Sequence, residues 1–304
     1  GIIYSDGYVQ QSIHDDGWQE DVETYLDRTY DPIEQVLDTQ GNQLIVKVPL
    51  FDPPLHVAVW KVAVGRIPLY LMDTDIEIND PWNRGITARL YIGDLEQRLR
   101  QEIVLGLGGA QVLKTLGIDH YLLHLNEGHA AFALLERIRA TVSTGKDFAT
   151  ACEKNINTTI FTTHTPVAAG HDVFPFQLIE KYFHSYWPDL GLDRDAFFQL
   201  GIHPEKPGAG FNMTAFALRL SGYRNAVSKR HAEVSRKMWR SLWPEVSEDQ
   251  VPIDYVTNGV HLGSWLSLEM KQLFDRYLGP AWREEPADEA TWAKALRIPP
   301  EELW

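Results

Sequence analysis

Two kinds of apolar spacing follow one another along this chain of 304 residues. Apolar side chains alternate with other residues at 43–48 and 57–62, and 67–72 is a short apolar run. Alternation with a period of two is typical of strands that bury one face. We therefore predict a β-rich segment over about residues 5–75.

From about residue 94 the spacing becomes helical. Leu95, Leu99, Ile103, Leu107 and Ala110 fall on one stripe, which predicts a helix over residues 94–116. Further strands are expected at 121–125, 158–163 and 253–257, and further helices at 128–140, 176–186 and 212–239. Strands that alternate with helices of this length favour an α/β fold with a parallel sheet.

The last segment, residues 276–304, has a different character because Pro and Trp interrupt it repeatedly. This composition predicts a peripheral helix or an interdomain connector rather than part of the sheet. We therefore expect a domain boundary after residue 275.

Composition excludes several classes of function. The formal net charge of −14 argues against sequence-independent nucleic-acid binding, which needs a basic surface. No run approaches the roughly 18 apolar residues of a membrane span. Cys152 is the single cysteine, which excludes a disulfide within the chain and favours a reducing cytoplasm.

The candidate chemistry gathers where three predicted strands end. Asn126, Glu127 and His129 follow the first strand, His164 follows the second, and Asn258 follows the third. Parallel strands bring their carboxyl ends to the same edge of a sheet, where ligands of such folds bind. Amide, carboxylate and imidazole groups there make the directional hydrogen bonds that recognise hydroxyl groups.

Each of these residues also has an ordinary structural explanation. Asn126 is a good helix cap, and Glu127 is favoured by the dipole at a helix start. His164 is compatible with an ordinary surface loop. Asn258-Gly259 is compatible with a tight turn, for which Asn-Gly is the strongest short signal.

Two other kinds of site are not expected. The histidines at 120, 124, 129, 164 and 171 do not share one helical face, and no cysteine accompanies them, so we predict no metal site. The glycines in residues 106–109 follow a charged, helix-periodic run rather than a strand, which is the wrong context for a phosphate loop. These glycines are expected to let a helix approach the sheet closely.

The same strand ends resemble the motifs of the α-glucan (glycogen or maltodextrin) phosphorylases. The matching segments appear in family order, and they are Asp16-Gly17-Trp18-Gln19, Arg89-Leu90-Tyr91, Arg100-Gln101-Glu102, Asn126-Glu127-Gly128-His129, Thr162-Thr163-His164-Thr165, Phe211-Asn212-Met213, Asn225-Ala226-Val227 with His231, and Thr257-Asn258-Gly259-Val260. The Asn-Glu-Gly-His variant, and His261 after Val260, look like the short bacterial and archaeal branch. Leu262-Gly263-Ser264 departs from both branches.

This resemblance implies a two-lobed glycosyltransferase of the GT-B type. Residues 1–275 would form the latter part of its N-terminal, Rossmann-like lobe with a β-rich insertion, and 276–304 would lead toward a C-terminal lobe. The family transfers a terminal α-1,4-linked glucose to inorganic phosphate and gives glucose 1-phosphate with retention. Sugar-nucleotide-dependent GT-B transferases and non-catalytic glucan-binding modules are the alternatives.

The resemblance also assigns roles to individual residues. Asn258 would hydrogen-bond the 6-hydroxyl of the transferred glucose, and the main-chain carbonyl of His164 would face the developing positive charge. Substrate-binding roles fall to Asn126, to Glu127 and His129 on the acceptor side, to Val227 at the sugar ring, and to Asp94 in a gate over the cleft.

The cofactor implied by the resemblance is pyridoxal phosphate, but no lysine here matches the family's cofactor motif. That lysine is expected beyond residue 304, so we predict that the isolated chain is inactive. Expected partners are the glucan, phosphate and a C-terminal lobe, with a homo-oligomer possible in principle, and neither nucleic acid nor membrane.

Overall fold

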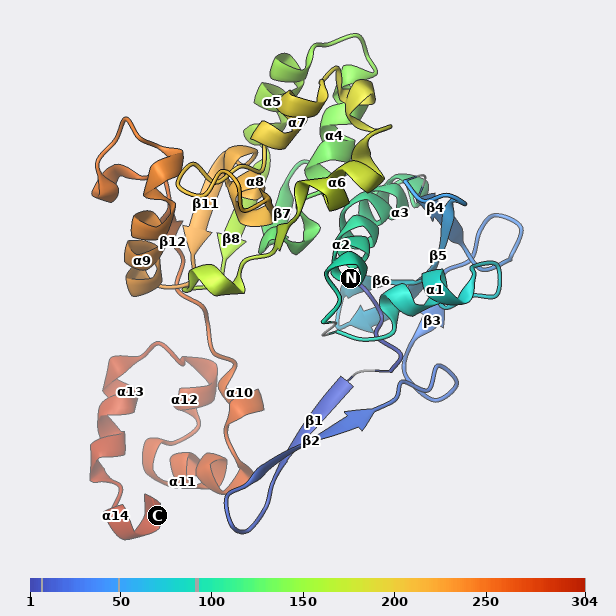
Figure 1. Cartoon of the computed structure of the whole chain (residues 1–304). Coiled ribbons are helices and arrows are strands. Elements are labelled where there is room, and N and C mark those ends of the chain that lie inside the picture. The colour runs from blue at the N-terminus through green and yellow to red at the C-terminus, as the bar shows by residue number, and fades with distance from the viewer. Residues whose placement is uncertain (7, 49, 91–92, 304) are drawn as a thin grey trace. The chain divides into compact units, whose positions relative to one another are not determined.

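The chain divides by packing into two units, Gly1–Val256 and Thr257–Trp304. The computed structural model describes residues 1–6, 8–48, 50–90 and 93–303 (Figure 1). The division precedes the boundary expected after residue 275, because Leu273 packs with Leu278, Trp282 and Ile298 in a core of its own. The predicted assignment of residues 1–275 to one lobe therefore describes a longer segment than the first packed unit.

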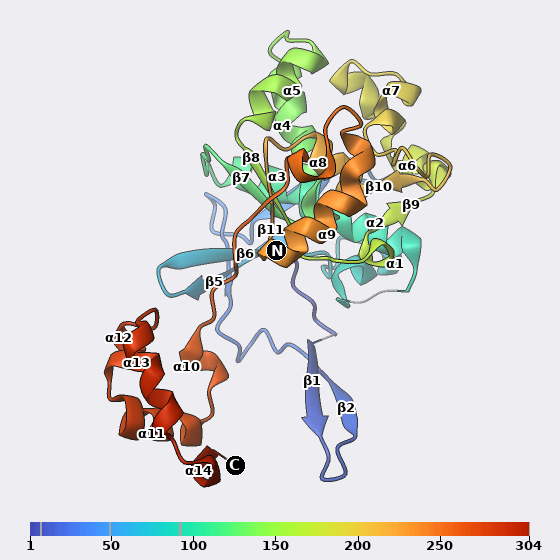
Figure 2. The ribbon, with the colours of Figure 1, turned by 90° about the vertical axis from the view of Figure 1, so that its left-hand side faces the viewer.

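The β-rich prediction is confirmed in the first unit. Strands β3 (Glu34–Gln35), β4 (Ile45–Val48), β5 (Leu55–Val64) and β6 (Ile67–Asp73) form an antiparallel sheet in which β5 pairs with the other three. The alternation in β4 has the expected consequence, since Val46 and Val48 are buried while Ile45 is exposed. Strands β1 (Tyr8–Ile13) and β2 (Gln19–Thr24) form a separate antiparallel hairpin (Figure 2).

The helix predicted over 94–116 is a single helical run with a change of pitch inside it. It consists of α2 (Leu95–Ile103), a π-helical turn η2 (Val104–Gly108) and α3 (Gly109–Thr115). Gly108 approaches the antiparallel sheet, because a Cβ there would lie 3.3 Å from Val48 Cγ2. Gly106 approaches a different element, since its Cβ would lie 2.7 Å from Phe132 Cβ and 2.8 Å from Ala133 N. Close packing therefore explains these glycines.

Replacing Gly106 by alanine is expected to lower the free energy of unfolding by about 1–3 kcal/mol, because the added methyl group meets backbone atoms that cannot move freely. The matched control is Gly109→Ala, whose Cβ would lie 3.7 Å from Met72 Cε. Alanine favours helix over glycine by up to about 1 kcal/mol, so the control is expected to be neutral or stabilising. Urea unfolding measures the free energy of unfolding of both variants and so separates the effect of close packing from that of helix propensity. Equal changes in the two variants would contradict the prediction for Gly106.

The second sheet is parallel and carries the predicted strand ends. Its order is β12 (Asp254–Tyr255), β11 (Tyr223–Ala226), β8 (Thr159–Thr163) and β7 (Leu123–Asn126). Its helices include α4 (Ala133–Val142) and α5 (Phe148–Ile156), which pack on each other, and α9 (Lys229–Trp239), which packs on β11 and β12. The predicted parallel α/β arrangement with flanking helices is therefore present (Figure 1).

The single helix predicted over 212–239 is wrong. The segment forms α8 (Met213–Arg219), the inner strand β11 and then α9. The first helix ends at Arg219, and Gly222 then packs against the end of α5, where its N–H donates to Ile156 O at 2.9 Å and a Cβ would lie 2.5 Å from that oxygen. The strand was missed because Arg224 and Asn225 give it no apolar alternation, although it pairs on both sides.

The remaining elements of the first unit are short, apart from the eight-residue helix α6. They are α1 (Pro81–Arg84), η1 (Gly85–Thr87), η3 (Gly128–Ala130), η4 (Ala168–Gly170), β9 (Val173–Phe174), α6 (Phe176–Phe183), η5 (Trp187–Leu190), α7 (Arg194–Gln199), β10 (Phe211–Asn212), η6 (Arg240–Leu242) and η7 (Glu248–Gln250). The second unit contains α10 (Leu262–Trp265), α11 (Leu268–Leu278), α12 (Ala281–Glu284), α13 (Glu289–Ala293), η8 (Lys294–Arg297) and α14 (Pro300–Leu303). None of the helices in the described residues has the length and apolarity needed to cross a membrane.

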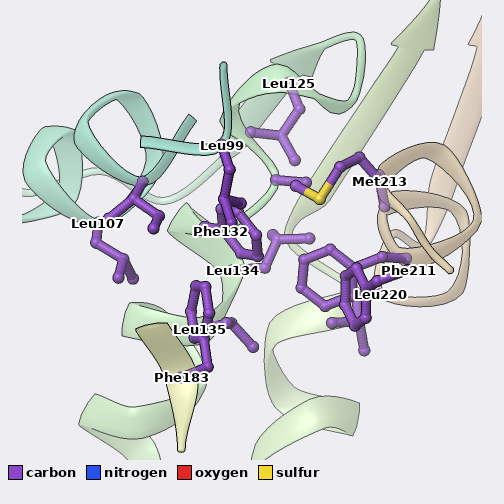
Figure 3. Packing of buried hydrophobic residues seen from close by; sticks show 14 of the residues in the cluster. Leu99, Leu107, Leu125, Phe132, Leu134, Leu135, Phe183, Phe211, Met213 and Leu220 are labelled. Carbon is purple, nitrogen blue, oxygen red and sulfur yellow. The ribbon is translucent and has the colours of Figure 1, made fainter. Parts of the chain in front are cut away.

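An aromatic cluster occupies the core of the first unit (Figure 3). Phe132 is fully buried, and its ring centroid lies 4.7 Å from that of Phe183, 6.0 Å from Phe216 and 6.4 Å from Phe211. Phe132 directly precedes α4, so the cluster anchors the segment that follows β7. Cys152 on α5 is buried nearby in the same core, and burial raises the pKa of its thiol to about 12.

Candidate functional site

The carboxyl ends of three parallel strands lie side by side. Asn126 at the end of β7 is in register with Thr162 on β8, and Thr163 is in register with Ala226 on β11. His164 and Val227 therefore leave the sheet at neighbouring positions, next to Asn126 and Glu127. Asn126 and His164 are also in contact through their side chains, because Asn126 Oδ1 lies 3.2 Å from His164 Nε2.

Glu127 turns toward the backbone of the neighbouring strand end. Its Oε1 accepts hydrogen bonds from the N–H groups of His164 and Thr165, the latter at 2.7 Å. Its own N–H donates to Thr162 O at 2.9 Å. Glu127 is buried, and its backbone has φ 63° and ψ 178°. It is the sole non-glycine residue with positive φ in the described part of the chain.

A second set of polar contacts crosses the sheet just before the carboxyl ends of these strands. Thr162 Oγ1 lies 2.7 Å from His124 Nε2 and donates to Asn225 Oδ1 at 2.9 Å. One side chain from each of β7, β8 and β11 takes part. These contacts fix the spacing of the three strands immediately below the candidate site.

His129 belongs to a compact charged cluster. Its Nδ1 lies 3.1 Å from Asp172 Oδ2, 2.7 Å from Arg98 Nη2 and 3.6 Å from Glu102 Oε1. Arg98 also pairs with Asp172 at 3.1 Å and with Glu102 at 3.4 Å. Glu102 is 1% exposed, and neither carboxyl oxygen has a hydrogen-bond partner among the described residues. The cluster joins α2, η3 and the loop before β9.

Burial and charge move the proton affinities of this cluster in opposite directions. Burial raises the pKa of Glu102 to about 8. The hydrogen bond to Asp172, together with the nearby carboxyl group of Glu102, raises the pKa of His129 to about 9. Burial alone would raise the pKa of Asp172, but His129, Glu102 and Arg98 together hold it well below its usual range. At neutral pH the cluster therefore contains a neutral Glu102, a cationic His129 and an anionic Asp172.

Glu102, His129 and Asp172 have ligand atoms within 4.8 Å of one another, which is a spacing that a metal ion can use. Arg98 already places a guanidinium against the same three side chains. A protonated His129 also offers no lone pair at Nδ1. The arrangement is an ion-pair cluster, and we propose no metal for it.

Replacing Glu102 by glutamine is expected to flatten the pH dependence of stability between about pH 5 and 8. The folded state raises the pKa of Glu102 to about 8. The contribution of Glu102 to folding stability is therefore present at low pH and is lost as the pH rises through about 8. Urea unfolding at several pH values measures this. The control is Glu153→Gln, which replaces an exposed carboxylate on α5. If neither variant changed the slope of the free energy of unfolding against pH, the prediction would be wrong.

A cavity of about 670 Å³ adjoins the cluster. Its lining includes Tyr4, Gly93, Arg98, Glu102, His129 and Asp172. The predicted gate residue Asp94 lies beside it as the N-cap of α2, where its side chain accepts a hydrogen bond from Gln97 N at 2.8 Å. Tyr91, from the motif that precedes this gate, lies outside the described residues.

The two remaining predicted site residues differ in their surroundings. Val227 is half-buried, and its N–H lies 3.4 Å from His231 Nδ1. Asn258 is exposed and belongs to the second unit, so its position relative to the other site residues stays a prediction. Neither Asn258 nor Gly259 has positive φ, so the Asn-Gly hairpin turn is not formed.

Sequence reasoning found His129 but missed its partners. Arg98 and Glu102 lie in a charged, helix-periodic run, and Glu102 also ends one of the segments that resemble the family, but neither was expected to contact His129. The available signal was that Glu102 stands next to Leu99 and Ile103 on the buried side of its helix. A carboxylate in such a position is buried and needs a partner. Asp172 had no comparable signal.

Comparison with known proteins shows what the chain is similar to. The chain is 43% identical to maltodextrin phosphorylase of Thermococcus litoralis over 304 residues, which is 100% of this chain and 36% of that protein. It is 42% identical to glycogen phosphorylase of Aquifex aeolicus over 304 residues, covering 100% of this chain and 44% of that protein. Over its whole length the chain is similar to these phosphorylases. The chain is also 38% identical to glycogen phosphorylase of Mycobacterium tuberculosis over 317 residues, which is 100% of this chain and 36% of that protein.

The similarity covers part of each relative. No family model matches the chain. The chain spans between 36% and 44% of the length of these three relatives. The similarity therefore extends across the whole of this chain, and it leaves more than half of each relative without a counterpart here.

Proposed function

We propose that the full-length protein is an α-1,4-glucan phosphorylase that transfers a terminal glucose to inorganic phosphate and gives glucose 1-phosphate with retention. The carrying observation is the strand edge at which Asn126, Glu127 and His164 contact one another, beside a cavity lined by His129. Similarity to proteins named maltodextrin phosphorylase and glycogen phosphorylase supports the reaction type. In this proposal residues 1–275 belong to the N-terminal lobe of a GT-B enzyme that acts in the cytoplasm.

The proposed contacts follow the strand ends. The His164 carbonyl and the Asn258 amide serve the transferred glucose, and Val227 touches its ring. Asn126 and His129 face the glucan. The exposed amide of Asn126 and the cavity-lining imidazole of His129 support these roles, since both can exchange hydrogen bonds with hydroxyl groups.

Phosphorylases of this family use pyridoxal phosphate, and the charges described here do not fit its phosphate. The cations at the candidate site, Arg98 and His129, both lie against Glu102 and Asp172 and are not free for an anion. The cluster also holds the negative charge of Asp172, which an anionic group avoids. We therefore propose that the lysine and the phosphate site of the cofactor lie in another part of the protein.

The test uses the full-length protein, maltodextrin and inorganic phosphate, with glucose 1-phosphate as the measured product. Release that depends on both substrates supports the proposal. Glucose transfer from a sugar nucleotide without phosphate would favour a synthase instead. The 304-residue chain alone is expected to form no glucose 1-phosphate and to retain no cofactor absorbance after dialysis.

A further inference from the structure

We infer that Glu127 is a positioning residue that holds the His164–Thr165 peptide, so that the His164 carbonyl faces the sugar site with increased negative character. This inference rests on the proposed function, because it assigns that carbonyl to the transferred glucose. It also changes the expected role of Glu127. Its carboxylate serves the backbone of the strand end and leaves direct contact with glucan to its neighbours.

The hydrogen bonds of Glu127 carry the first step. Oε1 accepts from the N–H groups of both His164 and Thr165. The next residue, Pro166, has no N–H group, so Glu127 takes both donors that this part of the loop offers. One buried oxygen therefore fixes two consecutive peptide planes at the carboxyl end of β8.

The planarity of the peptide bond gives the second step. In a trans peptide, the C=O of one residue and the N–H of the next point in opposite directions. The Thr165 N–H points at Glu127 Oε1 over 2.7 Å, so the His164 carbonyl points away from Glu127. No hydrogen bond between described residues ends on that carbonyl. It is thus oriented and still available to a ligand.

The backbone of Glu127 is held in place independently of its side chain. Its N–H donates to Thr162 O at 2.9 Å, which ties it to β8. Gly128 packs against the start of α8, where an added Cβ would lie 3.0 Å from Met213 Cβ. Glycine adopts the φ and ψ of Glu127 far more easily than other residues do. A glutamate at this strained position indicates that its carboxylate is needed there.

Charge provides the third step. A carboxylate that accepts from a peptide N–H makes a stronger hydrogen bond than a neutral acceptor, and it polarises the peptide. The His164 oxygen then carries more negative charge. Glucosyl transfer develops positive charge on the sugar ring in the transition state. The benefit of Glu127 should therefore appear in kcat rather than in KM.

Two substitutions in the full-length protein separate charge from geometry. Glu127→Gln keeps an acceptor oxygen and removes the charge, and kcat is expected to fall about 10-fold with KM for maltodextrin little changed. Glu127→Gly removes the side chain and relieves the strained backbone, and kcat is expected to fall about 100-fold or more without loss of melting temperature. Glu153→Gln, an exposed carboxylate on α5, is the control for the substitution itself.

Crystal structures of the same variants give a readout that does not depend on the reaction. The 164–165 peptide is expected to keep its orientation in the glutamine variant and to rotate in the glycine variant. If the wild-type protein released no glucose 1-phosphate, the proposed function would fail while this readout still tested the positioning role.

Three results would overturn the inference. These are an unchanged kcat in both variants, a raised KM with normal kcat, and an unmoved peptide in the glycine variant. A raised KM alone would make Glu127 a substrate contact. If the glycine variant did not fold, the kinetics of the glutamine variant would decide.

Discussion

Truncating Phe132 to alanine is expected to lower the free energy of unfolding by about 3–5 kcal/mol, which is the usual cost of removing a buried aromatic ring. Phe132 is fully buried and contacts the rings of Phe183, Phe211 and Phe216. These rings come from α6, β10 and α8, so the cavity would open where three elements meet. Collapse is difficult there, because Gly106 already packs tightly against Phe132.

Urea unfolding followed by circular dichroism measures this loss. The matched control is Tyr121→Ala, since Tyr121 is 82% exposed and its removal leaves no buried cavity. Surface substitutions of this kind usually change stability by less than about 0.5 kcal/mol. A loss below about 1 kcal/mol for Phe132→Ala would show that the cluster repacks around the gap.

Replacing Asn258 by alanine in the full-length protein is expected to lower kcat/KM by about 5- to 150-fold, if its amide reads a glucose hydroxyl in the transition state. The melting temperature should hardly change. Asn258 is exposed in this chain, its side chain makes no hydrogen bond to a described residue, and the tight turn that would give it a structural role is not formed.

Glucose 1-phosphate formation and the melting temperature of the same variant test this prediction together. Asn42→Ala is a suitable control, because Asn42 is an exposed asparagine in a loop of the β-rich segment. Normal turnover with a lowered melting temperature would contradict the substrate role of Asn258 and restore a structural one.

The sequence predicted the strands and helices best where apolar spacing was regular. The helix around Leu99 and the strands β5 and β8 lie close to their expected positions. Strand β11 was missed because its stabilisation comes from pairing on both sides, which polar residues such as Asn225 permit as well as apolar ones. Pairing depends on distant segments, so local spacing does not reveal it.

The candidate site was predictable in part, because regular apolar spacing was enough to predict a parallel sheet. Parallel topology was enough to expect Asn126, Glu127 and His164 at one edge. It did not reveal that Glu127 would bind backbone N–H groups, because that contact depends on its unusual backbone angles. The partners of His129 come from a helix and a loop distant in sequence, so only folding brings them together.

The burial of Cys152 makes it an internal reporter of opening. Thiol reagents attack the thiolate, and a pKa near 12 leaves almost none at neutral pH while α5 is packed. Alkylation of the peptide that contains Cys152 therefore requires α5 to separate from the core. The rate of alkylation, followed by mass spectrometry, would measure how often α5 separates from the core under native conditions.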